Sequence, residues 1–136
     1  MISRLLSVFS ALVILTLVVY GGIIKDGSFT ASSDGTNIRI RWASEDEVGV
    51  ARYELERMAG VSGSFFLLVQ ISPKGNNSSY EFVDETALRL TESIYKYQLK
   101  VVFANNDPPL YYGPITVSHN PSSVRRTWGS IKAMFR

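Results

Sequence analysis

The sequence predicts an all-β fold, a sandwich of seven strands, and three observations lead to this prediction. Between residues 27 and 118, apolar and polar residues alternate with a period of two, as in strands with one buried and one solvated face. Glycine, proline, asparagine and aspartate interrupt this pattern at the short spacing typical of a β-sandwich. The chain has 136 residues, of which 46% are hydrophobic, enough for one core but not two. We therefore expect a single domain over residues 27–118.

An apolar segment, residues 1–24, precedes this domain. Arg4 supplies one positive charge, and residues 5–24 carry none. This plan is typical of a secretory signal peptide, and Val19 and Gly21 are small enough for the positions before a cleavage site. An uncut helix of about twenty residues would also span a bilayer, at ~1.5 Å per residue. Signal peptide and membrane anchor both remain open. Either one predicts an exported domain that is secreted, periplasmic or anchored outside the cytoplasm.

Seven segments are predicted as strands. They are residues 28–32, 36–43, 51–58, 65–71, 79–83, 94–104 and 111–118. Turn-forming residues separate them, such as Ser33-Asp34-Gly35, where glycine permits a positive φ. Helix signals are nearly absent between these segments.

The alternation also predicts which side chains face the core. In the second strand Ile38, Ile40 and Trp42 share one face, so we expect Trp42 to be buried at the centre of the sandwich. The sixth strand is the most amphipathic, with Tyr95 and Tyr97 on its apolar face. The third strand is less clearly divided into an apolar and a polar face.

Composition and motifs favour a protein without catalytic chemistry. The chain has no cysteine, which excludes a disulfide framework, a thiolate metal site and a cysteine nucleophile. Its net charge of +2 is too small to imply a nucleic-acid partner. The single histidine, His119, is interpreted as a solvated linker residue. The acidic run 45–47 is interpreted as a solvated loop, with Glu45 paired to Arg57 across strands. We expect no catalytic residue, metal, cofactor or small-molecule substrate.

Several short motifs occur in a recognisable order. They are Trp42-Ala-Ser-Glu45, Tyr53-Glu-Leu-Glu56-Arg57, Tyr80-Glu-Phe-Val-Asp84 and Tyr95-Lys-Tyr-Gln-Leu-Lys100. Together they resemble the fibronectin type III module, an immunoglobulin-like β-sandwich, and more narrowly the short variant of exported proteins of Bacteroidetes-type bacteria. The resemblance implies that Tyr95 or Tyr97 bonds its hydroxyl to the upstream backbone, as a tyrosine corner. It also implies a spacer, an adhesive unit or a partner-binding surface, without naming a ligand.

The tail, residues 119–136, differs in composition from the domain. It contains no acidic residue, and its apolar residues recur at the three- and four-residue spacing of an amphipathic helix. The predicted contact residues are Arg125, Trp128, Ile131, Lys132 and Phe135. Of the 14 Lys and Arg residues, four lie in the tail and one is Arg4, which leaves nine against 12 acids in the domain and the two residues, Lys25 and Asp26, that precede it. The domain is therefore −3 and the tail +4.

A basic tail that is only marginally helical in isolation needs a surface on which to fold. That surface is its own domain, a protein partner that includes a second copy, or an anionic membrane. We expect a non-enzymatic exported module that mediates protein–protein contact or scaffolding at the cell envelope or outside the cell, with the tail as contact element. One alternative is a carbohydrate-binding module that uses Tyr111, Tyr112 and Phe103 as a stacking platform. The other is an accessory subunit of a secreted enzyme.

Overall fold

A computed structural model describes residues 22–89 and 93–120 of the chain. These residues form seven strands and a short 3₁₀ helix, η2 (Thr86–Arg89). The strands are β1 (Thr30–Ser33), β2 (Ile38–Ala43), β3 (Val50–Ala59), β4 (Phe66–Ile71), β5 (Ser79–Asp84), β6 (Ile94–Phe103) and β7 (Leu110–Ser118). The predicted all-β class with seven strands is confirmed. The predicted N-terminal and C-terminal helices lie outside the described residues.

Each observed strand begins and ends within two residues of its predicted bounds. The start of β2 shows why the differences arise. The carboxylate of Asp34 accepts hydrogen bonds from the backbone N–H groups of Thr36 and Asn37, at 2.8 and 2.7 Å. An aspartate that bonds the backbone in this way closes a turn. Thr36 and Asn37 therefore belong to the β1–β2 turn and not to the strand.

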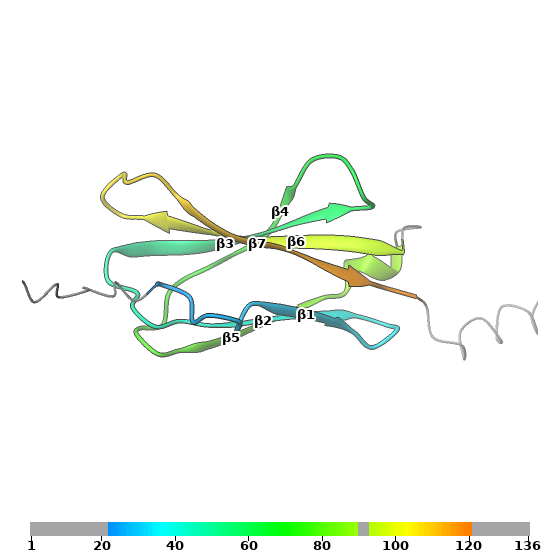
Figure 1. Ribbon diagram of the computed structural model, residues 1–136, viewed down its shortest axis with the longest axis horizontal. Helices are drawn as coiled ribbons and strands as arrows, with labels where there is room; N and C mark the ends of the chain where they lie inside the picture. Colours follow the sequence, from blue (N-terminus) through cyan, green and yellow to red (C-terminus); the bar gives the residue numbers. More distant parts are fainter. Residues whose placement is uncertain (1–21, 90–92, 121–136) are drawn as a thin grey trace, which may run out of the picture.

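The strands form two antiparallel sheets with the orders β1-β2-β5 and β4-β3-β6-β7. Figure 1 shows them as two layers, with the four-stranded sheet above the three-stranded sheet. Their facing side chains meet in one core. Its largest fully buried members are Trp42, Tyr53, Tyr95, Tyr97, Ile38, Ile40, Leu55, Leu99 and Val101. As predicted, Trp42 points inward and is only 2% exposed.

The first described residues already belong to this core. Ile24 is buried and forms an isolated bridge with Ser44. The carbonyl of Ile23 accepts a hydrogen bond from the Glu45 backbone N–H at 2.7 Å. Residues that the sequence places in the signal or anchor segment therefore contact the domain directly.

Three strands of the larger sheet meet at the end of the domain that leads into the tail. Ala59 of β3 pairs with Tyr95 of β6, and Tyr95 pairs with Val117 of β7. The Gly60 backbone N–H extends this row by donating to the Ile94 carbonyl at 2.8 Å. We call this the tail end of the domain. It lies at the right of Figure 1, where the β3–β4 loop begins and β7 finishes.

Candidate functional site

The predicted contact residues of the tail lie outside the described residues. They are Arg125, Trp128, Ile131, Lys132 and Phe135. The described residues define instead the place from which the tail departs and the surfaces near it.

His119, the last residue before Asn120, is buried, and its interpretation as a solvated linker residue is wrong. Only 2% of it is exposed. Its Nδ1 lies 2.6 Å from the Ser33 Oγ, and its backbone N–H donates to the Ser93 carbonyl at 2.7 Å. Its ring packs edge-on against Tyr95, with centroids 6.0 Å apart. His119 thus joins both sheets and fixes the direction in which the chain enters the tail.

An apolar patch lies beside the tail end, on β4 and the loop before it. Its members, which we call the β4 patch, are Val61, Phe66 and Leu67, with exposed fractions of 69%, 71% and 51%. A pocket of about 480 Å³ adjoins this patch. It is lined by Arg57, Met58, Ala59, Ser62, Gly63, Ser64 and Phe66. Neither the patch nor the pocket is among the features predicted from the sequence. The available signal was the lack of any charged residue between Arg57 and Lys74.

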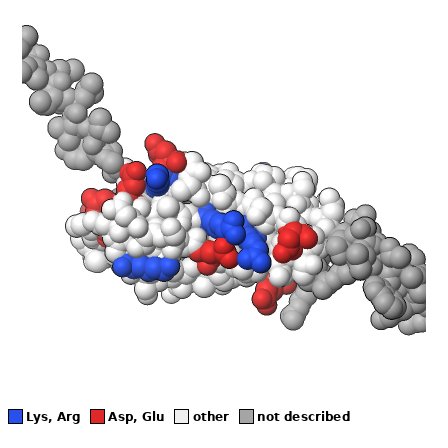
Figure 2. All heavy atoms as spheres, turned by 90° about the horizontal axis from the view of Figure 1, so that it is seen from below, with Lys and Arg blue, Asp and Glu red and all other residues white. Residues whose placement is uncertain are grey.

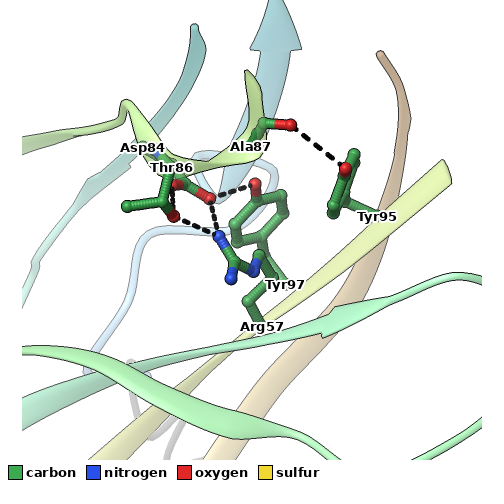
Figure 3. A network of polar contacts seen from close by, with 6 residues as sticks. All are labelled: Arg57, Asp84, Thr86, Ala87, Tyr95 and Tyr97. Carbon is green, nitrogen blue, oxygen red and sulfur yellow. Dashed lines mark hydrogen bonds and ion pairs between the residues drawn. The ribbon is translucent and has the colours of Figure 1, made fainter. Parts of the chain in front are cut away.

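Arg57, one of the residues that line this pocket, also belongs to a polar network between the two sheets (Figure 3). Asp84, at the end of β5, is only 1% exposed. Its Oδ2 accepts hydrogen bonds from Arg57 Nη1 and from the Tyr97 hydroxyl, both at 2.8 Å. Its Oδ1 accepts from the Thr86 hydroxyl at 2.7 Å and from the Thr86 backbone N–H at 3.0 Å. The network therefore ties β3 and β6 of one sheet to the end of β5 in the other.

The same network corrects one predicted ion pair. Arg57 pairs with Asp84 and not with Glu45, because its side chain points between the sheets toward the end of β5. Burial alone would raise the pKa of Asp84, but the hydrogen bonds from Thr86, Arg57 and Tyr97 outweigh it and hold the pKa below its usual value.

The two candidate corner tyrosines have different partners. The Tyr95 hydroxyl donates to the backbone carbonyl of Ala87, eight residues upstream, at 3.2 Å. The Tyr97 hydroxyl donates to the Asp84 side chain instead. Tyr95 therefore makes the backbone contact that the resemblance implies, and Figure 3 shows both bonds side by side.

A second buried carboxylate, Glu47, lies in the loop before β3. It is 6% exposed, so the interpretation of this acidic run as a solvated loop is wrong at this residue. Its Oε1 accepts hydrogen bonds from the hydroxyls of Tyr53 and Tyr80, and its Oε2 accepts from the Gly75 backbone N–H at 2.6 Å. Tyr80 also stacks on Trp42, with ring centroids 5.1 Å apart. The loop is thereby fixed to the centre of the core.

The partners of Glu47 also affect acid–base behaviour. Burial alone would raise the pKa of Glu47, but the hydrogen bonds, led by that from Tyr80, lower it. Burial and the neighbouring Glu47 carboxylate raise the pKa of Tyr80 to about 12. Both oxygens of the Glu47 carboxylate accept hydrogen bonds from groups of the domain. The cluster therefore holds the loop before β3 to the loop before β5.

Replacing Glu47 by glutamine should lower the free energy of unfolding by roughly 1–2 kcal/mol, because an amide nitrogen would face donors where a carboxylate now accepts. Denaturant titration measures the change. Asp46→Asn is the matched control, since Asp46 is exposed and its acceptor role toward the Val48 backbone N–H survives in asparagine. Equal stabilities of the two variants would contradict the structural role of Glu47.

The three aromatic residues considered for sugar stacking do not form one exposed platform. Tyr111 is 55% exposed. Tyr112 and Phe103 are half-buried and pack against the core. Because Tyr111 and Tyr112 are consecutive in β7, their side chains point to opposite faces of the sheet.

Among residues 22–89 and 93–120, no three metal-binding side chains lie close enough together to hold an ion. No helix within these ranges is long and apolar enough to cross a membrane. Comparison with protein-family models finds no matching family, and comparison with curated proteins finds no match either. Function must therefore be inferred from the sequence and from this geometry.

Proposed function

We propose that this chain is an exported β-sandwich module of fibronectin type III kind that mediates protein–protein contact or scaffolding at the cell envelope or outside the cell. It works without catalysis, and its basic tail is the contact element. The observation that carries the proposal is the arrangement of the tail end. There the chain leaves the two-layer domain after β7 and leads into a segment with basic and apolar residues, at the same end of the domain as the exposed β4 patch.

Two features of the fold support the assignment to this class of module. The strand orders β1-β2-β5 and β4-β3-β6-β7 are those expected of a seven-stranded sandwich in which three strands face four. The bond from the Tyr95 hydroxyl to the Ala87 carbonyl is the corner contact that the motifs imply.

The chemistry of the buried polar groups supports a binding role and not a catalytic one. Asp84 and Glu47 are each surrounded by donors from the fold. Catalytic carboxylates usually face a cleft with their pKa raised toward neutrality, whereas hydrogen bonds lower the pKa of both of these groups.

The position of His119 supports the tail as a contact element. Because His119 is held by Ser33 and Ser93, the tail starts from a defined point on the domain. The tail carries a charge of +4 and the domain one of −3, and the aromatic residues Trp128 and Phe135 are of the kind that usually contribute most binding energy.

Deleting residues 122–136 should leave the domain folded and abolish the principal association of the protein. Pull-down from envelope fractions with full-length and truncated chains measures the association, and thermal melting measures the fold. The double substitution Trp128→Ala and Phe135→Ala should reproduce most of the loss. Tyr111→Ala is the control on a distant exposed aromatic and should leave association unchanged.

Two outcomes would contradict the proposal. A truncated chain whose melting temperature falls by more than about 10 °C would show that the tail is part of the core. Glycan binding that is lost in Tyr111→Ala, with association unaffected by truncation, would favour the carbohydrate-binding alternative.

A further inference from the structure

The pocket beside the β4 patch has a lining suited to a negatively charged ligand. Among the described residues that line it, Arg57 is the only charged one, and the others are Met58, Ala59, Ser62, Gly63, Ser64 and Phe66. Ser62 and Ser64 add two exposed hydroxyl groups. The volume of about 480 Å³ lies in the range of roughly 300–1,000 Å³ that is usual for ligand sites. The lining therefore offers hydrogen-bond donors and apolar surface without an acidic side chain.

Arg57 keeps donors that the fold does not use. Its hydrogen bonds to Asp84 and Thr86, at 2.8 and 2.6 Å, both come from Nη1 (Figure 3). Nε and Nη2 have no hydrogen-bond partner among the described residues. The buried side-chain nitrogens without a partner in this part of the chain are those of Trp42 and His119, so Nε and Nη2 of Arg57 reach solvent. The N–H groups on these two nitrogens are therefore free to bind a ligand.

Asp84 already pairs with Arg57, but it leaves the pocket open. Each oxygen of Asp84 accepts two hydrogen bonds from the domain, and only 1% of the residue is exposed. It is not among the residues that line the pocket. Glu56, the neighbour of Arg57 in β3, points to the opposite face of the sheet and accepts a hydrogen bond from Gln98. Neither carboxylate therefore occupies the place of a ligand.

Phe66 provides the apolar side of the same site. It pairs with Arg57 across β3 and β4, and residues paired in this way point to the same face of the sheet. Phe66 is nevertheless 71% exposed, whereas the Arg57 side chain is only 17% exposed. Val61, also in the β4 patch, extends the exposed apolar surface into the loop before β4. A ligand that bonds to Arg57 would therefore also cover the ring of Phe66.

The basic groups of the smaller sheet are shared with an exposed acid. Figure 2 shows the face seen from below in Figure 1, where acidic and basic groups are interspersed. On the three-stranded sheet, Arg39 and Arg41 both pair with Glu81, at 3.1 and 2.6 Å. A carboxylate that approached these arginines would meet Glu81 beside them. Among the described residues, no acid lines the pocket at Arg57.

We propose that this pocket binds a glutamate or aspartate side chain of a partner protein, in a segment whose neighbouring residues are apolar. A carboxylate can accept hydrogen bonds from Nε and Nη2 of Arg57 together, the two-point geometry in which arginine binds carboxylates. The apolar neighbours would cover Phe66 and the rest of the β4 patch. The inference rests on the proposed function, because it states the chemistry of the partner. The +4 charge of the tail, which leaves from the same end of the domain, favours the same acidic partner.

Other occupants fit the pocket less well. The tail contains no acidic residue, and its basic side chains would be repelled by Arg57. An anionic membrane presents its phosphate groups on a broad surface, whereas the Arg57 side chain is only 17% exposed and lines a hollow. A single protruding side chain can enter such a hollow.

Binding of a defined peptide tests the proposal. The probe is the fluorescein-labelled peptide Gly-Ser-Leu-Glu-Leu-Phe-Ser-Gly, and the matched probe has glutamine in place of glutamate. Fluorescence anisotropy with the full-length chain in detergent measures both dissociation constants. We expect the glutamate peptide to bind about tenfold more tightly, because hydrogen bonds to an ionised acceptor are stronger than those to a neutral one. Equal dissociation constants for the two peptides would overturn the proposal.

Charges introduced at Ser64 distinguish the pocket from the basic tail. Ser64 is exposed and lines the pocket, so these substitutions are compatible with the folded domain. Ser64→Asp should weaken binding of the glutamate peptide about fivefold, and Ser64→Lys should strengthen it by a similar factor, because the new charge lies near the bound carboxylate. A purely steric effect would weaken binding in both variants. Ser72→Asp is the control at an exposed position after β4, at the opposite end of the sheet, and should leave binding unchanged.

The outcomes also separate this inference from the proposed function. Peptide binding that changes in opposite directions in the two Ser64 variants supports the carboxylate site. Unchanged binding in both variants would overturn it, even where deletion of residues 122–136 abolishes the association with envelope proteins and so supports the proposed function. An association that survives this deletion would contradict the tail as contact element and would leave the result at Ser64 standing.

Vesicles of phosphatidylglycerol are the comparison ligand, because they carry negative charge without a protein partner. We expect vesicle binding to be the same in Ser64→Asp, in Ser64→Lys and in the wild type. Vesicle binding that follows the charge at Ser64, while peptide binding does not, would overturn the proposal in favour of a membrane surface.

Discussion

Replacing Trp42 by alanine should lower the free energy of unfolding by about 3–5 kcal/mol, a large part of the stability of a domain of this size. Trp42 is 2% exposed and lies between the two sheets. Its indole stacks on Tyr80 with an interplanar angle of 7°, and it meets Tyr53 edge-on at 5.9 Å between centroids. The substitution would leave a cavity beside two large rings that are themselves held by Glu47, so the core cannot easily collapse into the space.

Denaturant titration of the wild type and the variant measures this loss. Trp42→Phe is the informative second variant. The indole N–H of Trp42 has no hydrogen-bond partner among the described residues, so phenylalanine forfeits packing alone, and we expect a cost of roughly 1–2 kcal/mol. Val48→Ala is the surface control, because Val48 is 78% exposed and should change stability by less than about 0.5 kcal/mol. A loss below about 1 kcal/mol for Trp42→Ala would contradict a central position for this residue.

The strands and the orientation of Trp42 could be predicted because alternation is a local signal. In β2 and β6, apolar residues recur at every second position. All of that face is buried in β2, and all of it except the last residue, Phe103, is buried in β6. Burial of one face fixes the register, since a slip of one residue would expose all of that face. The same reasoning gave the ends of the strands to within two residues.

The buried polar residues could not be predicted, because their burial depends on partners far away in the sequence. His119 is next to a proline-containing segment and looks like a linker residue, but its ring is held by Ser33, 86 positions earlier. Glu47 lies in an acidic run, yet its partner Tyr80 is 33 positions later. No local pattern indicates such contacts. The β4 patch was missed for a related reason, since alternation alone does not reveal whether a strand lies at an edge.

Asp84→Ala should lower the free energy of unfolding by about 3 kcal/mol, the second largest effect that we expect. The change leaves the Arg57 guanidinium, the Tyr97 hydroxyl and the Thr86 side chain without their shared acceptor. The estimate is at the lower end of the range for a broken buried ion pair, because the Arg57 side chain is 17% exposed and keeps some contact with water. Thr86→Val removes one donor and should cost less, about 1 kcal/mol.

The pH dependence of the free energy of unfolding distinguishes the contribution of the Asp84 charge from the contribution of its packing. The pKa of Asp84 is lowered in the folded state, so its stabilising effect is complete above the unfolded pKa of about 3.9 and disappears as the pH falls through the folded pKa. Asp84→Asn keeps the shape without the ionised group. We expect the stability difference between wild type and this variant to be roughly 2 kcal/mol above about pH 5 and to shrink below about pH 4. The other carboxylates with lowered pKa values, such as Glu47 and Glu81, are present in both proteins and cancel in the difference. A difference that is constant between pH 7 and the acid transition would show that the Asp84 carboxylate is not the charged partner of Arg57.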